Sequence, residues 1–130
     1  MLVKDVMQTD VTTISALASV RNAMRAMREQ STRFLVVRRE GDHDAFGVIS
    51  FTSILRTIVA EEGDIDLLNV YDICIKPAIS VHPDLDVKYV ARLMINKSFR
   101  RLLVVRDNDL LGVITREDIV QPILEIAEGS

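Results

Sequence analysis

The sequence is poor in the residue types on which disulfide and metal chemistry depend. It has one cysteine, two histidines and no tryptophan among 130 residues. Cys74 has no partner for an internal disulfide or a metal site, which favours a small buried hydrophobic side chain there. His43 and His82 lie far apart, without a carboxylate cluster at ligand spacing. Asp42 and Asp44 flank His43 and offer a cation site, but a polar turn between two strands fits the same stretch better.

Long apolar runs and a dominant basic stripe are also absent. The longest apolar runs, such as 34–37 and 102–105, have the length of strands and fall far short of the roughly 20 residues that span a membrane. Met1 is not followed by a basic and then apolar leader, so we expect a cytoplasmic protein without membrane contact. The formal net charge is −3, which argues against nucleic acid as a partner.

Sequence motifs of the common catalytic chemistries are missing as well. There is no GxxxxGK[ST] loop, no nucleophile beside a base and no set of histidine and cysteine ligands. We therefore expect neither enzyme activity nor a catalytic cofactor.

What the sequence does contain is an internal repeat of about fifty-five residues. Residue n matches residue n+67 over the first part of the repeat, as in Asp5 with Asp72 and Met27 with Met94. After a one-residue slip, the run RFLVVR at 33–38 matches RLLVVR at 101–106. Past a loop three residues longer in the first half, GVISFTSIL at 47–55 matches GVITREDIV at 112–120. The apolar content of 48% is sufficient for one compact domain, or for two half-domains that share a core.

Hydrophobic periodicity predicts the order β-α-β-β-α in each repeat. Alternating β-branched residues predict short strands at 11–14 and 78–81. Apolar residues at i, i+3, i+4 and i+7 then predict helices from Val20 and from Val87. Ser19 is the expected N-cap of the first of these, and Asp84 or Asp86 that of the second.

Two strands and a second helix complete each predicted repeat. Nearly continuous apolar runs predict strands buried on both faces, at 34–38, 46–50, 102–106 and 110–115. The second helices begin at Ser50 and Thr115. Gly63 is expected to end the first of them, and Pro122 to kink or restart the second because proline has no N–H to donate.

These features together resemble the cystathionine-β-synthase (CBS) domain. The resemblance rests on the Gly-hydrophobic-hydrophobic-Thr/Ser-x-x-Asp motif and on the arginines that lead into Leu-Leu-Val-Val. Two such domains in tandem resemble a Bateman module with no catalytic domain attached. The family's frequent proline ahead of Val-Val is replaced by Leu35 and Leu103, which bears on packing. We assign residues 1–63 to the first CBS repeat, 64–69 to a linker and 70–130 to the second, in an α/β (α+β) fold of two pseudo-symmetric repeats packed sheet to sheet.

The resemblance implies a regulatory adenosine ligand in a cleft between the repeats, namely AMP, ADP, ATP or S-adenosylmethionine. It assigns Asp118 to the ribose hydroxyls and Thr115 to ribose or phosphate. A carboxylate can accept from both hydroxyls of a cis-diol, and guanidinium groups suit phosphate. By position, the phosphate-facing residues are Arg100, Arg101 and, in the first repeat, Arg33. The adenine-facing residues are Pro77 to Ser80, including Ile79, together with Phe99.

Each of these residues also has a purely structural interpretation. Thr115 and Asp118 match an ordinary helix start with a carboxylate in its first turn. Arg100 and Arg101 fit solvated residues on a strand edge, and Phe99 fits the core. Against the first interpretation, the matching helix start in the first repeat has Ser53 in place of Asp118. We therefore expect the first-repeat site to bind adenosine ligands weakly or not at all.

Two further expectations concern assembly and the alternative function. The apolar helix surfaces Leu55/Ile58/Val59 and Ile119/Ile123/Leu124 are more apolar than a small monomer exposes, which predicts a homodimer. A regulated protein partner is not identified by the sequence. The alternative to a nucleotide-binding module is a structural dimerisation or protein-interaction module with empty clefts.

Overall fold

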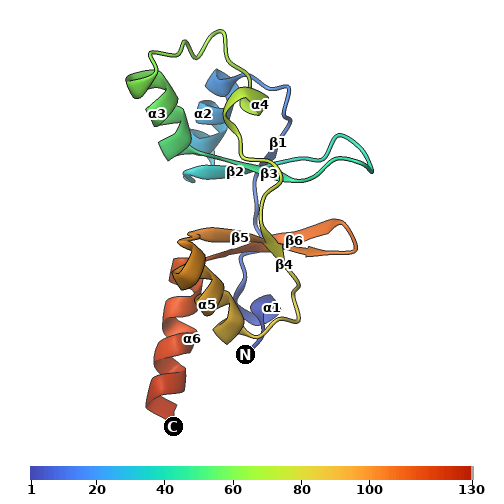
Figure 1. Cartoon of the computed structure of the whole chain (residues 1–130), viewed down its shortest axis with the longest axis vertical. Coiled ribbons are helices and arrows are strands. Elements are labelled where there is room, and N and C mark those ends of the chain that lie inside the picture. The colour runs from blue at the N-terminus through green and yellow to red at the C-terminus, as the bar shows by residue number, and fades with distance from the viewer. Residues whose placement is uncertain (130) are drawn as a thin grey trace. The chain divides into compact units, whose positions relative to one another are not determined.

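The computed structural model describes residues 1–129, which form two compact units. The first-repeat unit is Thr12–Ala78, and the second-repeat unit combines Met1–Val11 with the residues from Ile79 onward. The units therefore divide the chain differently from the repeats, because the first eleven residues join the second unit. Figure 1 shows this exchange, with the blue helix α1 beside α5 in the second-repeat unit.

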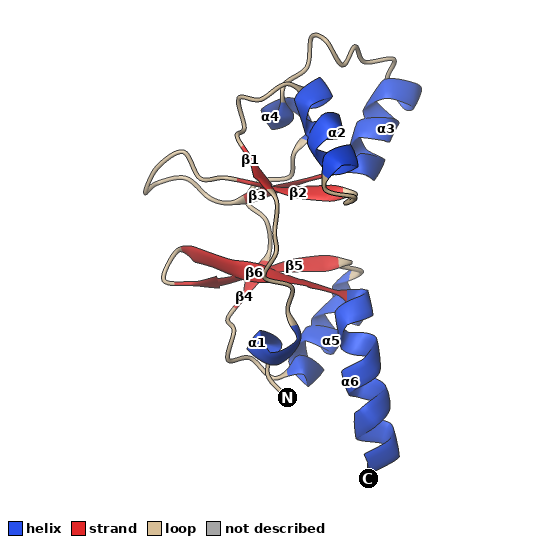
Figure 2. Cartoon of the chain, turned by 180° about the vertical axis from the view of Figure 1, so that it is seen from behind, coloured by secondary structure: helices blue, strands red, loops and turns tan. Residues whose placement is uncertain are grey.

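The first-repeat unit has a three-stranded sheet with its helices on one face (Figure 2). Its sheet has the order β1-β2-β3, with β1 parallel to β2 and β3 antiparallel to it. The elements in chain order are β1 (Thr13–Ile14), α2 (Val20–Glu29), β2 (Phe34–Val37), β3 (Gly47–Ser50), α3 (Phe51–Ala60) and α4 (Val70–Ile73).

The second-repeat unit has the same arrangement, with the sheet order β4-β5-β6. The elements are α1 (Val3–Val6), β4 (Ser80–Val81), α5 (Val87–Lys97), β5 (Arg101–Arg106), β6 (Asp109–Thr115) and α6 (Arg116–Gly129). The β-α-β-β-α order predicted from the sequence is confirmed in both units, and each unit also receives a four-residue helix from the start of the other repeat.

The two four-residue helices, α1 and α4, begin in the same way. The Asp5 carboxylate accepts from the backbone N–H of Leu2 at 2.9 Å, and the Asp72 carboxylate accepts from that of Asn69 at 2.8 Å. A carboxylate in this position satisfies an N–H that the helix leaves without a partner. The repeat match between Asp5 and Asp72 thus reflects a shared helix start.

Each unit buries its own apolar core between helices and sheet. The strands contribute Leu35 and Val37 to the first core and Leu102 and Val104 to the second, all fully buried. Cys74 is partly buried against the first core, in agreement with its expected role. Part of the predicted apolar surface also belongs to the cores, because Ile119 is 9% exposed and Ile58 and Ile123 pack against the core residues.

The structure confirms the predicted N-terminal caps of α2 and α5 but not the predicted C-terminal end of α3. Ser19 accepts from the Asn22 N–H at 3.0 Å, and Asp86 accepts from the Lys88 N–H at 2.8 Å, so Asp86 and not Asp84 is the cap of α5. The expectation that Gly63 ends α3 is wrong. The helix ends at Ala60, and Glu62 adopts the left-handed conformation.

Gly63 allows close packing just beyond the end of α3. A Cβ atom there would lie 2.9 Å from Thr57 Cγ2, and its N–H donates to the Thr57 carbonyl at 2.9 Å. Of the kink or restart predicted at Pro122, the restart is wrong, since α6 continues through this buried residue as one helix. The missing N–H of Pro122 removes a single hydrogen bond from the helix.

Candidate functional site

The predicted ligand site centres on the point where β6 ends and α6 begins. The Asp118 side chain, in the first turn of α6, accepts two hydrogen bonds from Thr115 through its Oδ2 atom. One comes from the Thr115 backbone N–H at 2.8 Å and the other from the Thr115 hydroxyl at 2.9 Å. This is the arrangement of a helix-capping carboxylate, so the structural role that the sequence allowed for Asp118 is present.

A second group holds the same carboxylate from the opposite end of the chain. Gln8 Nε2 donates to Asp118 Oδ1 at 3.0 Å and to Oδ2 at 3.2 Å. With these contacts Oδ2 has three donors and Oδ1 has one, although a carboxylate oxygen has two lone pairs. Oδ1, on a half-buried side chain, therefore keeps capacity for a further donor.

The backbone of Gln8 is fixed against β6. Gln8 and Val113 exchange two backbone hydrogen bonds, at 2.8 and 2.9 Å. Gly112 makes this close approach possible, because a Cβ atom at that position would lie 2.4 Å from the Gln8 carbonyl oxygen. The glycine of the repeated Gly-Val-Ile motif thus positions the Gln8 side chain beside Asp118.

The first-repeat unit has the same backbone pairing, but the polar side chains of Gln8 and Asp118 are absent from it. Ile75 exchanges two backbone hydrogen bonds with Val48, both at 2.9 Å, as Gln8 does with Val113. A Cβ atom on Gly47 would lie 3.0 Å from the Ile75 carbonyl oxygen. Where the second-repeat unit has Gln8 and Asp118, the first has Ile75 and Ser53.

The Ser53 hydroxyl is occupied locally. Ser50 Oγ accepts from the Ser53 N–H at 3.2 Å and donates to Ser53 Oγ at 3.0 Å. The serine pair therefore caps α3, and the described structure of this unit has no carboxylate at the matching position.

Gln8 was missed by the sequence analysis. It lies 110 residues from Asp118 and belongs to no local motif. A signal was available in the repeat itself, because the n+67 match places Gln8 beside Ile75 as a polar-for-apolar exchange.

Arg101 is the predicted phosphate-facing residue that lies next to this group. It pairs directly with Thr115 across β5 and β6, and residues so paired project from the same face of a sheet. Burial is the main factor that lowers the pKa of Arg101; the charge of Arg100 adds to the lowering and that of Glu117 opposes it. Arg100 is exposed, and its carbonyl accepts from the Arg116 N–H at 3.2 Å.

The predicted adenine-facing residues are distributed over different environments. Ile79 and Ser80 are exposed at the start of β4, where the Ile79 carbonyl accepts from the Leu103 N–H at 3.0 Å. Phe99 packs against the second core, as its structural interpretation requires, and its carbonyl accepts from Arg116 Nε at 2.9 Å. Pro77 and Arg33 belong to the first-repeat unit.

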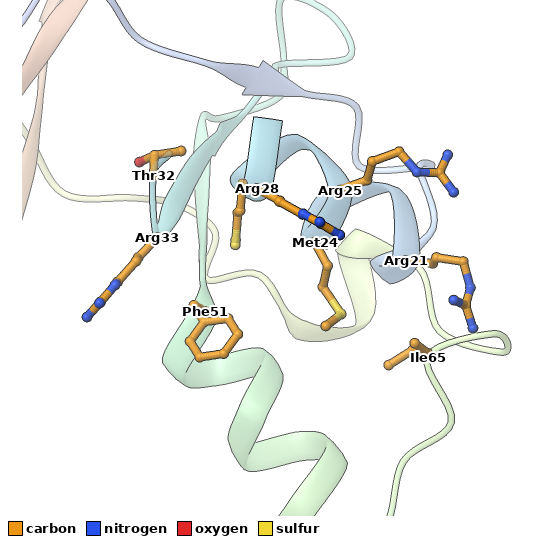
Figure 3. Close-up of a pocket in the computed structure, with 9 residues that line it drawn as sticks. Arg21, Met24, Arg25, Arg28, Thr32, Arg33, Phe51 and Ile65 are labelled. Carbon is orange, nitrogen blue, oxygen red and sulfur yellow. The ribbon is translucent and has the colours of Figure 1, made fainter. Parts of the chain in front are cut away.

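Arg33 lines a groove of about 730 Å³ on the helical side of the first-repeat unit (Figure 3). Its polar lining is dominated by arginines, with Arg21, Arg25 and Arg28 from α2 in addition to Arg33. The apolar part includes Met24, Phe51 and Ile65. The structure thus places Arg33 among other arginines of its own unit.

The stretch around His43 is organised by internal contacts. Asp44 accepts from Lys76 Nζ at 2.6 Å and from the Glu40 N–H at 2.8 Å. These hydrogen bonds, with the Lys76 one foremost, lower the pKa of Asp44 to about 2. Within residues 1–129, no group of three or more histidine, cysteine or acidic residues is arranged to hold a metal ion.

No helix among the described residues is both long and apolar enough to cross a membrane.

Comparison with known proteins identifies both repeats. The CBS domain family model matches residues 3–60 and 70–125. An uncharacterized protein of Methanopyrus kandleri is 32% identical over 120 residues, which cover 92% of this chain and 61% of that protein. The chain therefore spans about three fifths of the length of that relative.

Solved structures show the same fold. The hexameric CBS-CP12 protein from bloom-forming cyanobacteria is 32% identical, with a TM-score of 0.89 over 100% of this chain and 75% of that one. CBSX2 in complex with AMP is 25% identical, with a TM-score of 0.78 over 97% of this chain and 98% of that one. The CBS domain pair of MJ0100, in complex with 5'-methylthioadenosine and S-adenosyl-L-methionine, is 23% identical. Its TM-score is 0.80 over 95% of this chain and 99% of that one.

Proposed function

The chain belongs to the CBS domain family, and from this premise we propose that it is a regulatory module that binds an adenosine-containing ligand beside Asp118. The observation that carries the proposal is the asymmetry between the repeats. The second has a carboxylate at the helix start next to Arg101, while the first has Ser53 at the same place. A cap alone requires no such carboxylate, because Ser50 caps α3 without one.

In the proposed complex the ribose hydroxyls donate to the Asp118 carboxylate. Oδ1 has room for one donor while Gln8 stays in place, and the second hydroxyl requires the Gln8 amide to move aside. The backbone of Gln8 is held by Val113, so this movement is confined to its side chain. Ligand binding therefore exchanges one set of charge-assisted hydrogen bonds for another.

The proposed phosphate contacts come from Arg101, with Arg100 beside it. Two guanidinium groups together favour a ligand that carries phosphate over an uncharged nucleoside. Arg101 is half-buried in β5 on the same face as Thr115, so its reach toward a ligand at Asp118 is short. Ile79 and Ser80 are proposed to contact the base.

The solved relatives support this ligand class. CBSX2 binds AMP, and the MJ0100 domain pair binds 5'-methylthioadenosine and S-adenosyl-L-methionine. For this chain we propose AMP, ADP, ATP or S-adenosylmethionine, bound as a regulatory ligand and not turned over.

A specific observation favours one alternative function. Asp118 already makes four hydrogen-bond contacts within its own chain, which is the pattern of a purely structural carboxylate. In that case the module acts through protein interaction alone, without a ligand.

Titration calorimetry with AMP, ADP, ATP, S-adenosylmethionine and adenosine separates the two functions. A ligand that binds only the folded state raises the melting temperature, and the stabilisation grows with the logarithm of the ligand concentration divided by Kd. The proposal predicts saturable binding of at least one of these compounds, at one dominant site per chain, and a raised melting temperature. Absence of binding by all of them at millimolar concentration would support the protein-interaction module instead.

We also propose that the chain forms a homodimer through its helical faces. Leu55, Val59, Val120 and Leu124 are between 46% and 68% exposed, although all four are large apolar side chains. Burial of such a stripe against a second copy removes apolar surface from water. Light scattering at micromolar concentration measures the mass of the particle, and the expected value is twice the 14.6 kDa of one chain. A monomer would contradict the proposal.

A further inference from the structure

Two exposed apolar side chains lie next to each other at one end of the first-repeat unit. Leu17 is 71% exposed and Tyr71 is 54% exposed. The Tyr71 N–H donates to the Ala16 carbonyl at 3.0 Å, and the Val70 N–H donates to the Ala18 carbonyl at 2.8 Å. These hydrogen bonds on both sides of Leu17 hold it beside α4. Exposed apolar side chains that gather on one surface are typical of interaction sites.

The same backbone carries an ion pair in the second-repeat unit. The Lys4 N–H donates to the Pro83 carbonyl at 3.0 Å, in the same pattern as that of Tyr71. In this n+67 match, Lys4 takes the place of Tyr71 and Asp84 that of Leu17. Lys4 Nζ lies 3.2 Å from Asp84 Oδ1, and both side chains are exposed. The backbone therefore accepts a polar pair at these positions, and the fold does not require the apolar one.

Acidic side chains border this apolar pair. The stretch 61–72, which runs from the end of α3 into α4, has five acidic residues and no basic one. Its loop folds back toward α4, because a Cβ atom added to Gly63 would lie 3.1 Å from Leu68 Cδ1. Figure 1 shows this loop at the end of the unit that is remote from the sheet. The acidic residues are all exposed, namely Glu61, Glu62, Asp64, Asp66 and Asp72.

A third exposed apolar residue, Leu67, lies within this acidic stretch and is 81% exposed. Two of the carboxylates around it are already engaged. Asp66 forms an ion pair with Arg21 at 2.7 Å, and Asp72 accepts from the Asn69 N–H at 2.8 Å at the start of α4. The carboxylates nearer the end of α3 are therefore the charges that a partner would meet.

We propose that Leu17, Leu67 and Tyr71, here called the Leu17/Tyr71 patch, dock a basic amphipathic segment of a partner protein. Apolar side chains of that segment bury the patch, in which the tyrosine offers the largest contact area. Its lysines and arginines meet the surrounding carboxylates, which gives complementary charge. An anionic membrane surface would be repelled by the same carboxylates. The patch belongs to the first-repeat unit and shares no residue with the proposed nucleotide site around Asp118.

NMR titration of the isotope-labelled full chain with a model peptide tests the docking. The peptide has about 14 residues, with leucine at helical spacing and lysine between. The inference predicts that it shifts the amide signals of 16–18 and 67–72. Companion peptides with glutamate for lysine, or with serine for leucine, should bind at least roughly tenfold more weakly. Equal binding of either companion, or unchanged signals at 16–18 and 67–72, would overturn the inference.

Two double variants separate the apolar and the charged contributions to docking. Leu17→Asp with Tyr71→Lys copies the ion pair of the second-repeat unit and should weaken the leucine–lysine peptide roughly tenfold. Glu61→Lys with Glu62→Lys leaves the patch in place and should weaken the same peptide, because it reverses the charge beside it. Tyr89→Lys changes a tyrosine of nearly equal exposure, 53%, on α5 and is the matched control that should leave the affinity unchanged. Unchanged affinity in either double variant would contradict the docking.

Further measurements on the Leu17→Asp/Tyr71→Lys variant distinguish other occupants of the patch. Light scattering should give the mass of the natural chain, and AMP titration should give its affinity. A halved mass would make the patch an interface between copies of the chain. Binding of the natural chain, but not of the variant, to phosphatidylcholine vesicles would make it a membrane surface, and either outcome would overturn the inference. A chain that binds AMP but not the peptide would overturn this inference and leave the proposed function intact.

Discussion

The side-chain amide of Gln8 donates to both carboxylate oxygens of Asp118, at 3.0 and 3.2 Å, although 110 residues separate the two in sequence. The contact holds the N-terminal segment against the start of α6. It also occupies acceptor positions that the proposed ribose hydroxyls require. Gln8 is therefore expected to compete with the ligand for Asp118.

Gln8→Ala should tighten binding of AMP or ATP by roughly three- to tenfold. The removed contact is exposed, so its value lies at or below the low end of about 1.5 kcal/mol for a hydrogen bond to a charged group. Calorimetric titration measures the change. Gln30→Ala, at the exposed C-cap of α2, is a matched control that should leave affinity unchanged. Weaker binding by Gln8→Ala would show that Gln8 contacts the ligand or orients Asp118 for it.

Replacing Arg100 and Arg101 together by Ala should weaken AMP and ATP while sparing adenosine. The arginines are proposed to act on the phosphates, and added salt should accordingly weaken the nucleotides more than the nucleoside. Calorimetry at two salt concentrations measures both effects. An equal loss for all three compounds would mean that the pair acts through folding, since Arg101 is half-buried in β5.

Gly112→Ala should destabilise the protein by about 1–3 kcal/mol, the usual cost of an overpacked site. The added Cβ would lie 2.4 Å from the Gln8 carbonyl oxygen, against 3.0 Å from the Ile75 carbonyl oxygen for Gly47→Ala. Urea denaturation should therefore rank Gly112→Ala below Gly47→Ala in stability. Gly41→Ala is the control, because nothing lies within 4 Å of its added Cβ. Equal stabilities of all three variants would contradict the close approach at Gly112.

The contribution of Asp44 to the stability of the folded chain should decrease as the pH becomes acidic. Its pKa is about 2 in the folded chain, below the value of about 3.9 expected when unfolded. Because the folded-state pKa is the lower one, the contribution is present above about pH 3.9 and is lost as the pH falls toward 2. The melting-temperature gap between the natural chain and Asp44→Asn should narrow over that interval. A gap that stays constant down to pH 2 would show that the contact with Lys76 does not depend on the Asp44 charge.

Local sequence patterns predict the main helices and strands of the fold. They do not predict that α1 and α4 are exchanged between the two units. Periodicity around Val20 and Val87 predicts the helices, and nearly continuous apolar runs predict the strands that end at Ser50 and Thr115. The exchange of α1 and α4 is invisible to such patterns, because each helix has four residues and its partners lie in the other repeat. Only the repeat match of Asp5 with Asp72 indicated that they correspond.

The site shows the same division between local and distant contacts. Thr115, Asp118 and Arg101 were predicted from the resemblance to the CBS domain. The structure places Arg101 opposite Thr115 across β5 and β6. Gln8 could not be found in this way, since its contact depends on long-range backbone pairing with Val113. Phe99 was assigned a ligand role by position, but packing of its ring against the second core depends on tertiary structure.

The proposal that Asp118 binds the ribose of an adenosine-containing ligand is tested most directly by the affinity of Asp118 variants. Asp118→Asn keeps an acceptor for Thr115 but loses the charge, and Asp118→Ser copies Ser53 of the first repeat. Titration of AMP and ATP into both variants, with melting temperatures measured without ligand, separates binding from capping. Hydrogen bonds to a charged group are worth about 1.5–3 kcal/mol each, and about 1.4 kcal/mol is tenfold. The account therefore predicts a loss of roughly ten- to several-hundredfold in both variants, with at most a modest fall in melting temperature. Affinity unchanged within twofold in both would show that Asp118 is only a helix cap and would contradict the nucleotide site.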